Sequence, residues 1–129
     1  MFTVEQIQAA HSKVKNGADF PNYMQDIIQL GVISFETFVK DSHSVYFGKN
    51  NFTAKSKAKY SDLEISETVN KEQFILDLKL HQKGDTDYMA FCKDCAKSGI
   101  EKWIVKMSDM TCTYYDKSGN EILEEVIQS

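Results

Sequence analysis

The strongest constraint on the fold of this chain is a match between two of its own segments. Residues 19–47 align with residues 87–115 at a constant offset and without a gap. The matched positions include helix caps, glycines and aromatic residues, namely Asp19 with Asp87, Gly31 with Gly99, Phe35 with Trp103, and Tyr46 with Tyr114. We therefore expect two imperfect copies of one structural unit, related by a pseudo-twofold axis.

Helix signals open each copy in the same order. Residues 3–6 and 70–73 carry a capping-box pattern, in which a polar residue precedes a glutamine by three positions. Asp19 and Asp87 are expected to cap a second helix in each copy, with Pro21 tolerated in the first turn. The matched glycines then supply the left-handed residue that commonly ends a helix. Each copy should therefore begin with two helices.

Beyond each matched glycine the hydrophobic period changes from helical to alternating, which indicates half-buried strands. Further strands are expected around residues 45–47, 52–54, 111–115 and 122–127. The order in each copy is then two helices followed by three strands, an ααβββ repeat. This order predicts an α+β fold with an antiparallel sheet and the helices packed on one face.

The chain has the usual length of one domain, and its apolar share of 42% excludes a disordered class. We expect a single domain over residues 1–129, with pseudo-repeats at about 1–55 and 69–129 joined by an irregular segment at about 56–68. No signal-peptide pattern opens the sequence, and no apolar run is long enough to span a membrane. We therefore expect a cytoplasmic location and no membrane partner.

All 15 cationic residues are lysines, and the formal net charge is −4. Arginine supplies the forked donor that recognises phosphates and guanine edges, so its absence argues against sequence-specific binding of nucleic acid. The sequence also lacks a P-loop, a glycine-rich dinucleotide motif and an H-E-x-x-H motif. No cofactor is therefore expected.

Cys92 and Cys95 have the C-x-x-C spacing of redox and zinc sites. A structural zinc ion needs four ligands, and this spacing supplies two. In the internal alignment the two cysteines stand opposite Met24 and Ile27, on an apolar helix stripe. Because the chain has an odd total of three cysteines, we expect buried free thiols, with zinc or redox chemistry as the alternative.

His11 and His81 fall late in the first helix of each copy, on its apolar stripe. Each precedes an aspartate that is expected to cap the next helix, so one interpretation is a general base or a pH-sensitive contact. The other interpretation, which we favour, is a structural histidine that bonds carbonyl groups of the loop after its helix. The two residues are nevertheless the first candidates for a site.

Four segments carry a wider resemblance, namely HSKVKNGADFP at residues 11–21, FETFV at 35–39, TDY at 86–88, and the stretch from FC to GIEKW at 91–103. Together they resemble the YdfO-like family, a group of small uncharacterised bacterial and prophage-associated proteins often labelled "phage envelope protein". The resemblance implies an α+β fold and a mobile-element setting. It implies no established activity and no catalytic residues.

Our first hypothesis for function is a non-enzymatic protein-binding or regulatory module of a mobile element or a bacterial stress response. Its partner would be an unidentified protein or a second copy of the chain, forming a homodimer. The alternation of the strands supports this hypothesis, because it places Phe38 and Ile104 on the outer face of the sheet, where apolar side chains can meet a partner.

The second hypothesis is a small-ligand binder or an enzyme that uses His11 and His81 with Cys92 and Cys95 at the junction of the two copies. It predicts that the two histidines lie near one cavity with perturbed titration. A third hypothesis is a virion-associated structural protein, which predicts that the chain is present in purified particles.

Overall fold

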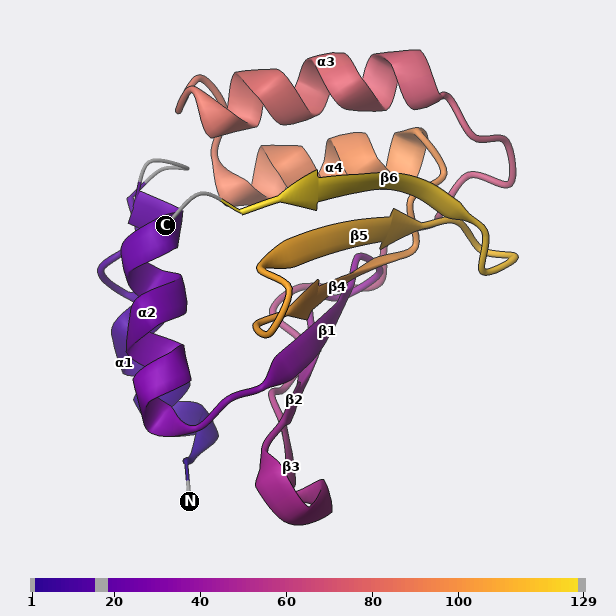
Figure 1. Ribbon diagram of the computed structural model, residues 1–129. Helices are drawn as coiled ribbons and strands as arrows, with labels where there is room; N and C mark the ends of the chain where they lie inside the picture. Colours follow the sequence, from indigo (N-terminus) through magenta and orange to yellow (C-terminus); the bar gives the residue numbers. More distant parts are fainter. Residues whose placement is uncertain (1, 16–18, 128–129) are drawn as a thin grey trace.

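The computed structural model describes residues 2–15 and 19–127. These residues form four α-helices, one short 3₁₀ helix and six strands (Figure 1). In chain order the elements are α1 (Val4–His11), α2 (Phe20–Leu30), β1 (Ser34–Phe38), β2 (Ser44–Phe47), the 3₁₀ helix η2 (Lys49–Asn51), β3 (Thr53–Lys55), α3 (Lys71–Gln82), α4 (Tyr88–Lys97), β4 (Lys102–Lys106), β5 (Thr111–Tyr115) and β6 (Glu121–Val126). The predicted α+β class is confirmed.

The strands form one antiparallel sheet in the order β3-β2-β1-β4-β5-β6. Two three-stranded meanders therefore join side by side through β1 and β4 at the centre. In that central pairing Glu36 lies opposite Ile104, and these two residues also match in the internal alignment of the sequence. This register is the one that a pseudo-twofold axis requires, while the descent of the two halves from one repeated unit stays a prediction.

One hydrophobic core lies between the helices and one face of the twisted sheet (Figure 1). Along β1 and β4 the side chains of Phe35, Trp103 and Val105 are buried, whereas Glu36 and Ile104 on the other face are partly exposed. The helices contribute Ile7, Met24, Ile27, Phe74, Phe91 and Cys95. This alternation is the pattern of a sheet that helices cover on one face, as predicted.

Three of the predicted helix caps are confirmed. The Thr3 hydroxyl accepts a hydrogen bond from the backbone N–H of Gln6, whose side chain accepts one from the backbone N–H of Thr3, so the capping box is complete. At the start of α3 the Asn70 side chain accepts from the N–H of Gln73, and at the start of α4 Asp87 caps in the same way. These local signals therefore position three of the four helices.

The predicted cap at Asp19 is wrong. In the described part of the chain its side chain makes no capping hydrogen bond, and its backbone is already helical, with φ −86° and ψ −9°. Its carboxylate instead accepts the N–H of Lys15 at 2.8 Å. Pro21 explains part of the difference, because proline in the first turn removes one of the N–H groups that a cap satisfies.

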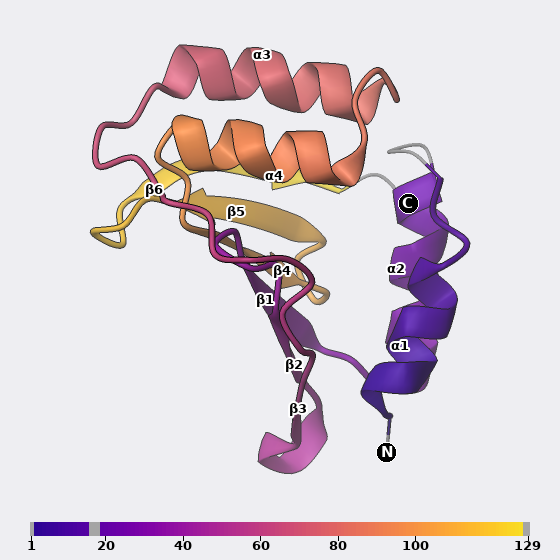
Figure 2. The ribbon, with the colours of Figure 1, turned by 180° about the vertical axis from the view of Figure 1, so that it is seen from behind.

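The segment at residues 56–68, all of which the structure describes, contains no helix or strand, as predicted. It is nevertheless fixed to both halves of the molecule. The N–H of Ser56 donates to Ser44 in β2, and the N–H of Ser66 donates to Ala96 in α4. Figure 2 shows the segment running along the sheet from the end of β3 to the start of α3. We call residues 56–68 the strap, because these hydrogen bonds connect them to both halves of the molecule.

Candidate functional site

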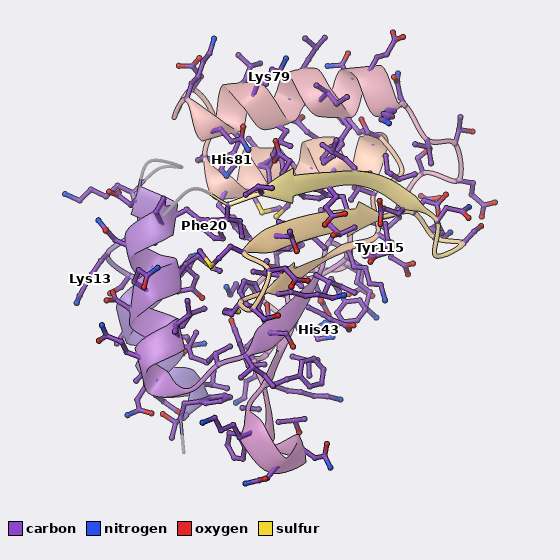
Figure 3. All side chains as sticks on the ribbon, viewed as in Figure 1. Lys13, Phe20, His43, Lys79, His81 and Tyr115 are labelled. Atoms are coloured by element: carbon purple, nitrogen blue, oxygen red, sulfur yellow. The ribbon has the colours of Figure 1, made fainter. Side chains whose placement is uncertain are left out.

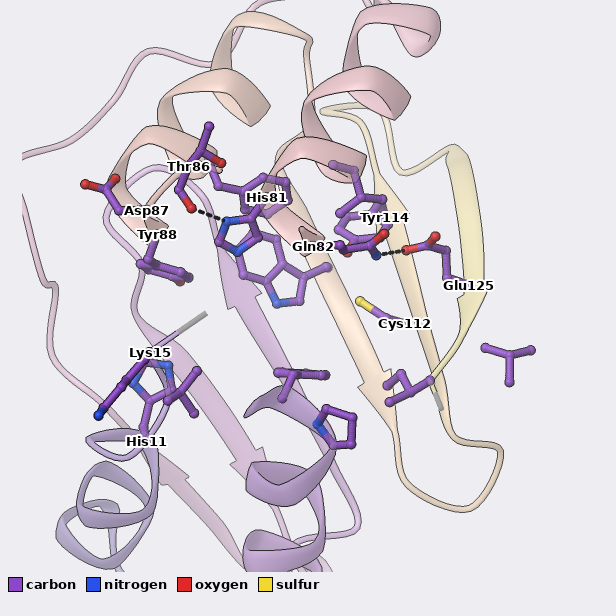
Figure 4. A pocket seen from close by; sticks show the side chains of 18 residues that line it. His11, Lys15, His81, Gln82, Thr86, Asp87, Tyr88, Cys112, Tyr114 and Glu125 are labelled. Atoms are coloured by element: carbon purple, nitrogen blue, oxygen red, sulfur yellow. Dashed lines mark hydrogen bonds between the residues drawn. The ribbon is translucent and has the colours of Figure 1, made fainter. Parts of the chain in front are cut away.

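A cavity of about 530 Å³ lies between the two helix pairs (Figure 4). Its lining comes from the end of α1, the start of α2, the C-terminal part of α3, the start of α4 and the strands β4, β5 and β6. Helices from both halves of the sequence thus face the same space. Figure 3 shows Phe20 from the first helix pair and His81 from the second on the two sides of it.

His11 and His81, the two histidines singled out from the sequence, both line this cavity. The helix signals placed each of them late in the first helix of its copy, and in the tertiary structure the ends of both helices face this cavity. Of the two aspartates that follow these histidines in the sequence, Asp87 also lines the cavity. Asp19 is not a lining residue, and its carboxylate accepts a hydrogen bond from the N–H of Lys15. The cavity that both histidines line is therefore the candidate site.

His81 is held in one orientation. Its Nδ1 lies 3.2 Å from the carbonyl oxygen of Thr86 in the loop after α3, as the structural interpretation predicted. Its ring stacks on Phe91, with the centroids 4.5 Å apart and the planes 10° apart. Burial lowers the pKa of His81, and the opposing effects of the Thr86 carbonyl and of Asp87 do not offset it. The ring is therefore mainly neutral at pH 7.

His11 is held by aromatic edges. Its ring meets Tyr23 edge-on at 5.2 Å between centroids and Tyr88 at 6.2 Å. Within the described residues, the ring hydrogen bonds of histidines are those of His43 and His81, so the predicted bond from His11 to a loop carbonyl is not found there. Burial, and to a lesser degree Lys59, lowers the pKa of His11.

Five of the residues that line the cavity carry the aromatic ring of a phenylalanine, tyrosine or tryptophan. Trp103 and Tyr114 form its floor on the sheet, where their ring centroids are 6.1 Å apart, and Tyr88 closes one side. The Tyr88 hydroxyl is 2.5 Å from the hydroxyl of Ser42 in the β1–β2 turn, so this ring is anchored from outside the cavity. Such a wall offers large flat contact surfaces to a ligand.

A third cysteine, Cys112, belongs to the lining of the cavity. Burial raises the pKa of Cys112 to about 12, so its thiol is protonated at neutral pH. Near it, the side chain of Gln82 donates to Glu125 at 2.9 Å and ties α3 to β6. The alternation of residues along β5 could have predicted that Cys112 faces the core. It could not have predicted that Cys112 lines the same cavity as the histidines, because that depends on how β5 packs against α3.

Cys92 and Cys95 are 0% exposed, lie on the buried face of α4 and are not among the residues that line the cavity. The expectation of buried free thiols is confirmed. Burial raises the pKa of both thiols, which disfavours the thiolate that metal binding or redox exchange requires. Within the described residues, no group of three or more histidine, cysteine, aspartate or glutamate side chains could hold a metal ion.

A second pair of polar side chains, His43 and Asp41, lies at the turn between β1 and β2. Nδ1 of His43 lies 2.6 Å from the Asp41 carboxylate, and its ring stacks on Phe38 at 4.6 Å between centroids. Burial tends to raise the pKa of Asp41, but the hydrogen bonds and charge of His43 outweigh it and lower the pKa. Figure 3 places His43 well away from Phe20 and His81, so this pair is not part of the cavity.

The outer face of the sheet carries a second hollow, of about 950 Å³, lined in part by Ile33, Phe47 and Ile104. Ile33 is 47% exposed. Ile104 is one of the two side chains predicted for this face, whereas Ile33 and Phe47 were not predicted for it. Its lining lacks the convergent histidines and the aromatic walls of the first cavity, so the first cavity is the stronger candidate for a small-molecule site.

None of the helices that the described residues form is long and apolar enough to span a membrane. No curated protein matches the chain. The model of a family described as "Protein of unknown function (DUF1398)" matches residues 8–126. This match covers the second half of α1, the other three α-helices, the whole sheet and every lining residue of the cavity except Ile127. The chain therefore belongs to the DUF1398 family, whose function is unknown.

Proposed function

We propose that this domain binds one small, largely apolar molecule in the cavity between its helix pairs. The observation that carries the proposal is the convergence of His11 and His81 on one cavity of about 530 Å³ with aromatic walls. Small-molecule sites commonly have volumes of roughly 300–1,000 Å³, with mostly apolar walls and a few polar groups that orient the ligand. The cavity has each of these properties.

Binding is favoured over catalysis by the state of the polar groups. A nucleophilic mechanism needs a side chain that an adjacent base activates. Cys112 is a protonated thiol, since burial raises its pKa to about 12. The ring hydrogen bond of His81 goes to a backbone carbonyl, so no described carboxylate orients this histidine as a base. A regulatory module that responds to a bound molecule is consistent with these features.

The resemblance to the YdfO-like family supplies a setting for the proposal, a cytoplasmic regulator carried by a mobile element. In that setting the bound molecule would change how the domain associates with a protein partner.

Association of two copies is a second candidate function, favoured by the exposed Ile33 in the outer hollow. If copies pair through this face, Ile33→Glu should lower the mass measured by light scattering, and an unchanged mass would contradict it.

The test of ligand binding is a titration of ¹⁵N-labelled protein with neutral aromatic fragments, naphthalene and indole, followed through the backbone amide signals. We expect the shifted signals to cluster at the residues that line the cavity. Fragments that leave these signals unchanged up to their solubility limit, or that shift signals over the whole surface, would contradict the proposal.

Two substitutions sharpen this test. Val14→Phe places a larger side chain in the cavity lining and should weaken fragment binding about tenfold or more, because it takes up space that the ligand needs. Leu76→Phe is the matched control, since Leu76 lies on α3, is 57% exposed and lies outside the lining. The control should bind the fragments as the unaltered protein does.

A further inference from the structure

The protonation state of His81 decides what its ring can offer to a ligand. Nδ1 lies 3.2 Å from the Thr86 carbonyl oxygen, and a carbonyl oxygen accepts hydrogen bonds but cannot donate them. Nδ1 must therefore carry a proton. Because burial keeps the ring mainly neutral by lowering its pKa, it holds one proton in all. The other nitrogen, Nε2, is then an acceptor with a free lone pair.

The position of this acceptor is also fixed. Stacking on Phe91 holds the plane of the ring, and the bond to Thr86 holds its rotation. Nε2 is the nitrogen farther from the backbone, and within the described residues the one ring hydrogen bond of His81 runs through Nδ1. Figure 4 shows the ring projecting from α3 into the space between Tyr88 and Gln82. A ligand in the cavity therefore meets an oriented acceptor.

The charged groups of the lining do not favour an anion. The carboxylate of Asp87 already accepts the N–H of Ala90 at 2.8 Å, and that of Glu125 accepts the Gln82 side chain. Lys15 is the one lysine of the described lining, and the chain contains no arginine. A phosphate or carboxylate deep in the cavity would have no paired cations to replace its lost hydration.

We infer that the cavity takes a neutral, planar aromatic molecule of the indole or phenol class, whose N–H or O–H donates a hydrogen bond to Nε2 of His81. The flat rings of Trp103 and Tyr114 provide the stacking surface for such a molecule, and His81 selects its donor group. This inference rests on the proposed function and specifies the ligand class of the same site.

The test compares indole with benzofuran, a molecule of nearly the same shape in which an ether oxygen replaces the N–H. Benzofuran is the less polar of the two, so burial alone gives indole no advantage. We expect the unaltered protein, studied by calorimetric or NMR titration, to bind indole about three- to tenfold more tightly, which is the usual contribution of one buried hydrogen bond. His81→Phe keeps a flat ring on Phe91 and removes the acceptor, so the preference should disappear. Leu76→Phe, at an exposed position of α3 outside the lining, is the control and should retain it.

The outcomes separate the two proposals. Equal binding of indole and benzofuran to the unaltered protein, or a preference that survives in His81→Phe, overturns the ligand class and leaves the binding site standing. Binding of neither compound overturns both. A measurement that needs no substitution is the ¹⁵N spectrum of the His81 ring, for which we expect a protonated Nδ1, a bare Nε2 and a change at Nε2 when indole is added. A protonated Nε2 in the free protein at pH 7 overturns the inference.

Discussion

The two halves of the molecule share an order of elements but differ in how they hold their histidines. In the C-terminal half, His81 is fixed by the Thr86 carbonyl and by stacking on Phe91. In the N-terminal half, His11 rests against the edges of Tyr23 and Tyr88. Comparable positions in the two halves can thus have different chemical properties, because the loop and the helix that pack next to each histidine differ.

The cavity shows the same asymmetry. Most of its lining comes from the C-terminal half, including the sheet floor at Trp103 and Tyr114, while the first half contributes a smaller group around His11 and Phe20. The β6 strand has six residues and reaches the cavity, whereas β3 has three and does not. The C-terminal half therefore contributes most of the lining of the candidate site, and the N-terminal half contributes the smaller remaining part.

The largest expected difference between the halves is at the glycines that end α2 and α4. Both adopt the predicted left-handed conformation, with φ of 108° at Gly31 and 82° at Gly99. A Cβ at Gly31 would meet Phe2 at an ordinary 3.8 Å, but at Gly99 it would lie 2.8 Å from the Thr68 carbonyl oxygen. We expect Gly31→Ala to lower the free energy of unfolding by about 1–2 kcal/mol, through backbone strain alone.

Gly99→Ala adds a clash with the backbone of the strap, so its cost should reach about 3 kcal/mol or more. Urea unfolding of the two variants gives both numbers. Equal losses of stability would mean that the strap moves aside freely, which would contradict its role in holding the halves together.

A smaller difference is expected at the two aspartates that were predicted as caps. Asp87 accepts the N–H of Ala90 at 2.8 Å, so Asp87→Ala should cost about 1 kcal/mol, as is usual for the loss of an N-cap. Asp19 makes no capping bond in the described part of the chain, and Asp19→Ala should change stability by less than about 0.5 kcal/mol. Urea unfolding again measures both, and a larger cost for Asp19→Ala would reverse the comparison.

The smallest expected effect is the pH dependence that the two histidines contribute. In the folded protein the pKa of His11 and of His81 lies below the ordinary value of 6.5. As pH falls through 6.5, the unfolded chain therefore takes up protons before the folded protein does, and the free energy of unfolding decreases until pH passes the folded pKa values. At pH values well above 6.5 both rings are neutral in the folded and the unfolded protein, and this loss of stability is absent.

Two measurements check this prediction. The ring signals of His11 and His81 in a proton NMR titration should have midpoints below the ordinary histidine value. Urea unfolding at pH 7 and pH 5 should show a smaller loss of stability for His81→Phe than for the unaltered protein, because the variant lacks one group that protonates on unfolding. A loss that is the same or greater in His81→Phe would show that the carboxylates alone account for the acid sensitivity.

Much of the fold could be predicted because its signals are local. The capping box at residues 3–6 and the strand alternation around Phe35 and Trp103 require neighbours within a few positions, and each was found as expected. The failure at Asp19 is also local, because Pro21 removes an N–H group that a cap would satisfy and the N–H of Lys15 donates to the carboxylate instead. The candidate site could not be predicted from local signals alone. Cys112 and Glu125 come to line the same cavity as His81 only because β5 and β6 pack beneath α3.

The sequence by itself determined the element order, the caps of three helices, the glycine stops and the positions of His11 and His81 near the ends of equivalent helices. These features follow from backbone geometry and from the period of apolar residues, which act over short distances along the chain. Only the tertiary structure decided that the two helix ends line one cavity, that Cys92 and Cys95 lie outside it, and that Nδ1 of His81 faces the Thr86 carbonyl oxygen. Those properties depend on contacts between residues far apart in the chain, such as Trp103 with Tyr88, and local patterns carry no information about such distances.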